Sequence, residues 1–233
     1  MKPKENAYRQ MEKNTVKAAA QLQESEMVRF YNPAGKGKRL LFLGNSITLH
    51  GVKPDIGWHH AHGMAASAPE KDYVHLTMAK CNEIADDMAY CVCQGAEWER
   101  RYRNGEEVFP LYEQARLFHA DIAVMRLIEN CPAKDFCADA FQENLRRLLQ
   151  YLAPLSTTKW VFTTGFWRHP GDSAIADLAQ ELHLPLVPLG DLGERDEMKA
   201  LGLFAHEGVA NHPGDLGMQH LADRIFAAVK EYL

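Results

Sequence analysis

An α/β fold with a parallel sheet is predicted by three features of the sequence. Five short apolar runs alternate with segments of helix-forming composition. The runs are too short for ordinary helices and are bounded by turn residues, which is typical of buried parallel strands. A chain of 233 residues with 46% hydrophobic residues suits one packed domain. We therefore predict one domain with about five strands and helices on both faces of the sheet.

The N-terminal segment is expected to form a helical arm outside this domain. Tyr8 to Met27 contains helix formers throughout, and the turn residues of Asn32–Gly37 separate it from the first apolar run. We assign residues 1–34 to the arm and residues 35–233 to the domain. The sequence leaves open whether the arm packs on the domain or joins two copies into a homo-oligomer.

The strands and helices of the domain can be assigned in order along the chain. Strands are expected at Leu40–Leu43, Met88–Cys93, Ile122–Leu127, Trp160–Thr164 and Leu184–Val187. Helices are expected at Glu70–Ile84, Leu111–His119, Asp135–Leu152, Ser173–His183 and Pro213–Tyr232. Open α/β sheets bind ligands at the carboxyl ends of their strands. The predicted site therefore lies in the loops Asn45–Gly57, Gln94–Trp98, Glu129–Pro132, Gly165–His169 and Ala205–Pro213.

Composition and charge restrict the class of partner. The formal net charge of −5 leaves no basic surface for nucleic acid or anionic membranes. Residues 1–26 mix both signs of charge, and no apolar run is long enough to span a bilayer, so we expect a cytoplasmic protein. The five cysteines are odd in number and form no repeated CxxC pattern, which indicates reduced, buried thiols. Small molecules remain as expected partners.

A serine and a histidine at opposite ends of the domain are a candidate nucleophile and base. Ser46 follows the first predicted strand, and His212 lies in Asn211–Asp215, directly before Pro213. A histidine can take the proton that a hydroxyl loses when it attacks a carbonyl. Each residue also has a structural interpretation, Ser46 as a turn or cap residue and His212 as the entry to a helix.

The segments around these residues resemble the SGNH (GDSL-type) hydrolases. Gly44-Asn45-Ser46-Ile47-Thr48 is similar to the Gly-Asp-Ser-Leu block of that family, with Asn45 where aspartate is usual, and the segment with His212 is similar to its carboxy-terminal block. The resemblance covers the chain from about Lys38 to the end. The stretch Trp58–His75, which includes Gly63–Ser67, is similar to a carbohydrate-esterase-like subgroup. It implies a flavodoxin-like three-layer domain with strand order 2-1-3-4-5.

The same resemblance implies roles for individual residues. Ser46 would be the nucleophile and His212 the base, while the Ser46 amide, Gly95 and Asn130 would stabilise the oxyanion. Gly95 matches the family only by its position, and Ile128 replaces the glycine that usually precedes Asn130 by two residues. The implied activity is hydrolysis of short-chain acyl esters, O-acetyl groups on carbohydrates above all, through an acyl-serine intermediate and without a cofactor.

One position departs from the family pattern. The residue three before His212 is Val209, which cannot orient an imidazole as the usual aspartate does. Either a backbone carbonyl holds the second ring nitrogen, which we favour, or Glu129 or Glu207 reaches it from elsewhere. The departure leaves an alternative, a catalytically weak carbohydrate-binding protein on the same fold.

Other side chains near the predicted loops have two interpretations each. Arg126 and Glu129 form either a buried supporting pair or a substrate contact, and Asn45 is a further candidate for support. Trp58 could form a wall for a sugar ring, whereas Trp167 fits the core or the pocket wall. The histidines beside Trp58 lack a carboxylate or cysteine at a familiar ligand spacing, so no metal site is predicted.

Overall fold

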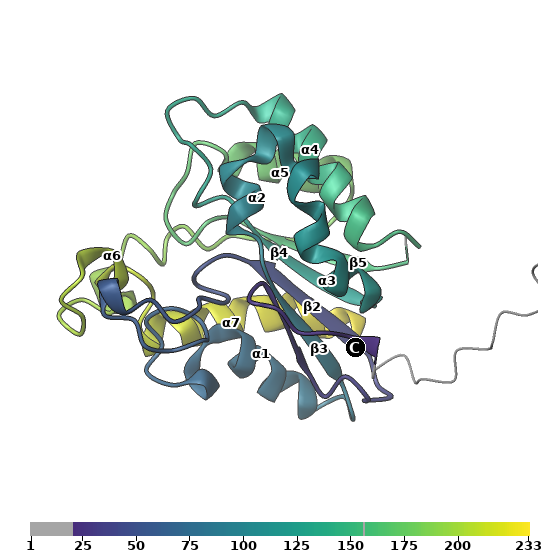
Figure 1. Cartoon of the computed structure of the whole chain (residues 1–233), viewed down its shortest axis with the longest axis horizontal. Coiled ribbons are helices and arrows are strands. Elements are labelled where there is room, and N and C mark those ends of the chain that lie inside the picture. Colours follow the sequence, from purple (N-terminus) through teal and green to yellow (C-terminus); the bar gives the residue numbers. More distant parts are fainter. Residues whose placement is uncertain (1–20, 156) are drawn as a thin grey trace, which may run out of the picture.

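A six-stranded sheet lies between two layers of helices in the computed structural model, which describes residues 21–155 and 157–233 (Figure 1). The strands follow the order β1-β3-β2-β4-β5-β6. The last five of these are parallel to one another, and among themselves they have the order 2-1-3-4-5. The strand bounds are β1 Val28–Tyr31, β2 Arg39–Gly44, β3 Ala89–Gln94, β4 Ile122–Arg126, β5 Lys159–Thr163 and β6 Leu186–Val187.

The edge strand β1 corrects the sequence prediction, because it lies within the residues assigned to a helical arm. It pairs antiparallel with β3, and its first residue, Val28, is fully buried in the core. The Tyr31 ring stacks on Tyr90 of β3 at 4.4 Å between centroids. Side-chain packing on the sheet decides the conformation of this four-residue segment. Of the predicted helix, residues 22–27 are not helical, and residues 8–20 lie outside the described part.

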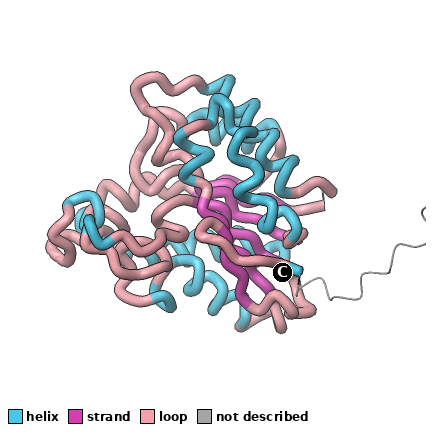
Figure 2. The backbone as a smooth tube through the Cα atoms, viewed as in Figure 1, coloured by secondary structure: helices cyan, strands magenta, loops and turns pink. Residues whose placement is uncertain are grey.

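Alternate residues of β2 show how the sheet separates two hydrophobic cores. Leu41 and Leu43 point into a core that contains residues of α3, α4 and α5, whereas Leu40 and Phe42 point into a core with α1 and α7. Figure 2 shows the strands between these two helical layers. The helix bounds are α1 Tyr73–Asn82, α2 Ala96–Arg100, α3 Glu113–Leu117, α4 Ala138–Leu152, α5 Asp172–Glu181, α6 Glu207–Ala210 and α7 Asp215–Val229.

The helices form where apolar residues recur at helical spacing. In α4, Phe141, Leu145, Leu148 and Leu152 are buried on one face. Helix α1 begins at a cap, because the Asp72 carboxylate accepts a hydrogen bond from the amide N–H of His75. The short helices α2 and α6 are not predicted, since four or five residues carry too little periodicity to be recognised.

The five cysteines are free, and all except Cys137 are buried. Across residues 21–155 and 157–233, no helix has both the length and the apolar character needed to cross a membrane.

Candidate active site

Ser46 lies in a tight turn that follows β2 at the carboxyl edge of the sheet. The amide N–H groups of Thr48 and Leu49 both donate to the carbonyl oxygen of Asn45, 2.9 Å away. A Cβ atom on Gly44 would lie 1.9 Å from the Thr48 hydroxyl oxygen, so only glycine allows the turn to close this tightly. The backbone thus presents Ser46 at the end of the strand without help from its own side chain.

A second segment supports this turn from outside the sheet. The amide N–H of Met64 donates to the carbonyl oxygen of Ser46 at 2.9 Å, and the neighbouring Gly63 N–H donates to the Asp72 carboxylate at 3.1 Å. Asp72 also caps α1, so the turn is tied to the start of that helix. The segment Gly63–Ser67 therefore helps to hold the serine in place.

His212 reaches Ser46 from the loop that precedes α7. Its Nε2 atom lies 2.8 Å from Ser46 Oγ, and its Nδ1 atom lies 2.7 Å from the carbonyl oxygen of Gly208. The His212 carbonyl accepts from the Ala200 N–H at 2.9 Å, which anchors the loop. The ring of Trp167 packs edge-on against the imidazole at 5.1 Å between centroids. Residues from opposite ends of the chain thus meet within hydrogen-bonding distance.

The surroundings of His212 favour its neutral form. Burial lowers its pKa to about 4, and the positive charge of Arg126 acts in the same direction, against the opposing effects of the Gly208 carbonyl and Glu129. Because a carbonyl can only accept, the proton of the neutral ring belongs on Nδ1. The lone pair of Nε2 then faces Ser46 Oγ, as a general base requires.

No carboxylate among the described residues bonds to His212. Glu129 is engaged by Arg126, Asn45 and the amide N–H of Phe166, and Val209 is buried in a small apolar cluster. A backbone carbonyl therefore stands where a triad acid would be expected.

Behind the serine turn lies a buried network of charged and amide side chains. Asn45 Nδ2 donates to Glu99 at 3.0 Å and to Glu129 at 2.6 Å. Arg126 donates to Glu129 at 2.5 Å and to the side-chain oxygen of Asn45. Arg126, Asn45 and Glu99 are fully buried, and the Glu129 side chain is only 6% exposed. Arg126 and Glu129 thus form a buried supporting pair, one of the two alternatives left open by the sequence.

The two residues considered for the oxyanion differ in their placement. Asn130 lines the same cavity as Ser46 and His212, and its Nδ2 donates one hydrogen bond to Glu99 at 2.6 Å. Gly95 instead donates its amide N–H to the carbonyl oxygen of Gly44, so this donor is not available to the cavity. A Cβ atom on Gly95 would lie 2.9 Å from Leu127, which explains the glycine by packing.

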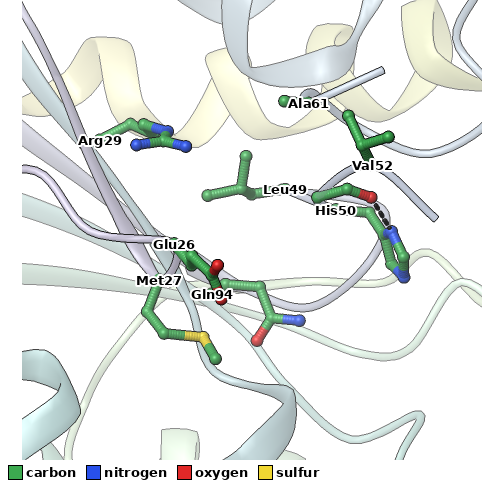
Figure 3. Close-up of a pocket in the computed structure, with 9 residues that line it drawn as sticks. Glu26, Met27, Arg29, Leu49, His50, Val52, Ala61 and Gln94 are labelled. Atoms are coloured by element: carbon green, nitrogen blue, oxygen red, sulfur yellow. Dashed lines mark hydrogen bonds between the residues drawn. The ribbon is translucent and has the colours of Figure 1, made fainter. Parts of the chain in front are cut away.

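Two cavities with shared lining residues lie near the serine turn. The first, of about 210 Å³, is lined by residues that include Ser46, His212, Asn130 and His50. The second, of about 360 Å³, shares His50 and Gln94 with the first. Figure 3 shows its mixed wall, which contains apolar side chains as well as polar and charged ones. The remaining lining residues of this second cavity are Glu26, Met27, Arg29, Leu49, Gly51, Val52 and Ala61.

Trp58 is placed differently from the sequence expectation. It is fully buried, packs with Met64 and Val209, and donates from its indole nitrogen to the carbonyl oxygen of His50 at 3.3 Å. It therefore supports the loop and offers no face to a sugar ring.

In the described part of the chain, no cluster of three or more histidine, cysteine, aspartate or glutamate side chains is arranged to hold a metal ion.

Glu99 and His50 belong to the site but are absent from the sequence prediction. Glu99 lies in a short segment with two other charged residues, Glu97 and Arg100, and nothing in the local pattern marks it as buried. His50 follows the serine by four residues, and only the fold shows that it lies between the two cavities.

Comparison with known proteins gives the fold of the chain. No protein-family model matches the sequence, and no curated protein sequence matches it. The structure is similar to that of the psychrotrophic esterase EstA from Pseudoalteromonas sp., with a TM-score of 0.51 and 14% identity over 84% of this chain and 98% of that one. It is also similar to a GDSL-like protein from Parabacteroides merdae, with a TM-score of 0.54 and 16% identity over 84% and 97% of the two chains.

A third solved structure is a two-domain esterase active on acetylated mannans. The TM-score is 0.56 and the identity 13%, over 86% of this chain and 50% of the esterase. The protein thus has the fold of the GDSL-type esterases.

Proposed function

We propose that the protein is a serine esterase that hydrolyses short-chain acyl esters through an acyl-serine intermediate. The observation that carries this proposal is the distance of 2.8 Å between Ser46 Oγ and Nε2 of His212, together with the Gly208 carbonyl oxygen 2.7 Å from Nδ1, which places the ring proton on Nδ1. Ser46 attacks the ester carbonyl while His212 takes its proton. His212 then returns the proton to the leaving alcohol, and water repeats the sequence to release the acid.

The proposed oxyanion donors are the Ser46 amide and the Asn130 side chain. Within the described residues, the Ser46 N–H donates to no protein acceptor, and one of the two Asn130 Nδ2 hydrogens remains after its bond to Glu99. Both residues line the smaller cavity. Fixed donors at such a position stabilise the negative charge that develops on the carbonyl oxygen.

The proposed substrates are acetyl esters of carbohydrates. The smaller cavity, of about 210 Å³, suits a short acyl group beside Ser46. The larger adjoining cavity offers Arg29, Glu26 and Gln94 to the hydroxyl groups of an alcohol such as a sugar. The fold likeness to an esterase active on acetylated mannans supports the same substrate class.

A series of p-nitrophenyl esters from acetate to octanoate tests this proposal. We expect the acetate to have the highest kcat/KM, and acetylated oligosaccharides to exceed p-nitrophenyl acetate if the larger cavity holds the alcohol. The Ser46→Ala protein gives the background rate. Equal rates for both proteins would overturn the esterase proposal and would favour a carbohydrate-binding protein, which a sugar-dependent rise in Tm would reveal.

A further inference from the structure

Glu99 of α2 is a buried carboxylate that contacts three hydrogen-bond donors of the site. It accepts from Asn130 Nδ2 at 2.6 Å, from the amide N–H of Ile128 at 2.5 Å and from Asn45 Nδ2 at 3.0 Å. Its side chain is completely buried, so water contributes nothing to these contacts. An ionised carboxylate is acceptor-only and therefore satisfies all three donors at once.

The chemistry of Glu99 determines which way the Asn130 amide faces. Because both carboxylate oxygens accept, the nitrogen of Asn130 and not its oxygen must face Glu99. One Nδ2 hydrogen is used in that bond, which leaves the second free for another acceptor, and Asn130 lines the cavity that contains Ser46. The same carboxylate holds Asn45, the residue directly before Ser46.

We propose that Glu99 is a positioning residue that orients the Asn130 amide toward the oxyanion and joins it, through Asn45, to the Ser46 turn. This inference rests on the proposed esterase function. Glu99 is not among the lining residues of the Ser46 cavity, and its hydrogen bonds to described residues go to Asn45, Ile128 and Asn130, so its effect on the oxyanion passes through Asn130.

The charges around Glu99 make this role dependent on pH. Burial, and after it the charge of Glu129, raise the pKa of Glu99 to about 7, against the hydrogen bonds from Asn130 and Asn45 and the charge of Arg126. Tyr112 and Cys131 also face this carboxylate. A proton on Glu99 replaces a charge-assisted acceptor by a weaker one, so Asn130 is held less firmly below neutrality.

Two separate steps are therefore expected in the pH dependence of kcat for p-nitrophenyl acetate. Between pH 8 and pH 6, kcat should fall by about fivefold as Glu99 gains its proton. Below pH 5, the remaining activity should disappear as His212, whose pKa is lowered to about 4, becomes protonated and ceases to be a base.

A double-mutant cycle with Glu99→Gln and Asn130→Ala tests the proposal. The glutamine side chain places an N–H group against the donors that Glu99 accepts from. We therefore expect kcat to fall about tenfold and KM to stay nearly unchanged, and the fall of kcat between pH 8 and pH 6 should disappear.

Asn130→Ala should lower kcat about a hundredfold. In the Asn130→Ala background, Glu99→Gln should add less than about twofold, because the residue through which it acts is gone. Glu97→Gln on the same helix, whose ion pairs with Arg100 and Arg101 lie at the surface, is the matched control.

Equal effects of Glu99→Gln in both backgrounds would overturn the proposal and assign Glu99 to folding alone. Circular dichroism shows whether Glu99→Gln folds. If it does not, the wild type is compared with Asn130→Ala: the fall of kcat between pH 8 and pH 6 must be present in the wild type and absent from Asn130→Ala. A wild-type kcat that is constant from pH 8 to pH 6 contradicts the proposal. Wild-type activity no higher than that of Ser46→Ala overturns the esterase function itself, and the role of Glu99 with it.

Discussion

Replacing Ser46 by alanine is expected to lower kcat for p-nitrophenyl acetate by at least about a thousandfold, because the nucleophile is lost. The fold should be unaffected, since among the described residues the Ser46 hydroxyl bonds only to His212, and the turn is held by backbone hydrogen bonds. Steady-state kinetics measure the loss, and an unchanged Tm verifies the fold. A variant that keeps more than about a tenth of the wild-type rate would exclude Ser46 as the nucleophile.

The His212→Ala change supplies the matched comparison. Serine and histidine act as one unit, so the double variant should be no slower than the slower of the two single variants. Multiplicative losses would mean that the two residues act independently, which is incompatible with proton transfer between them.

Replacing Arg126 by alanine is expected to cost about 3–5 kcal/mol of the free energy of unfolding. Arg126 is fully buried, bonds to Glu129, and its charge acts to lower the pKa of Glu99. Its loss therefore leaves two buried carboxylates without this compensating charge. Denaturant unfolding at pH 8 measures the effect. The matched control is Arg147→Ala, which removes exposed ion pairs with Glu106 and Glu143 and should leave the midpoint close to that of the wild type.

The cost of Arg126→Ala should decrease at lower pH. In the wild type, burial acts to raise the pKa of Glu129, but Arg126 and several hydrogen bonds outweigh it and lower the pKa. Without the arginine, both carboxylates have folded-state pKa values above their unfolded values, so the folded state binds more protons and gains stability as the pH falls. We expect Arg126→Ala to lower the free energy of unfolding less at pH 5 than at pH 8. A loss of unfolding free energy that is the same at both pH values would mean that lost packing, and not buried charge, is the cause.

The parallel part of the fold is predictable because its signal is local. The runs Leu40–Leu43 and Ile122–Leu127 are apolar on both faces except at Arg126, and the structure has β2 and β4 at these positions. The edge strand β1 is different, since its four residues are held by antiparallel pairing to β3 across more than fifty residues of chain. Such pairing leaves no periodic pattern in a segment this short.

The site is predictable to the extent that its residues follow strands. Ser46 and Asn130 lie just after β2 and β4, whose carboxyl ends meet at one edge, and the sequence therefore brings them together. The burial of Trp58 could not be foreseen, because its apolar neighbours come from the distant segments around Ala200 and Val209. The second hydrogen bond of His212 goes to a backbone carbonyl oxygen. Every residue has such a group, so the sequence cannot indicate which one is the acceptor.

Covalent labelling with an organophosphate tests most directly whether Ser46 is a nucleophile activated by His212. With diethyl p-nitrophenyl phosphate, Ser46 Oγ would bond to phosphorus, p-nitrophenolate would leave and His212 would hold the serine proton. Mass spectrometry of the digested protein should find one diethylphosphoryl group, on the peptide that contains Ser46. The label should be absent from Ser46→Ala and should form far more slowly in His212→Ala. An unlabelled protein, or a label on another residue, would contradict this assignment.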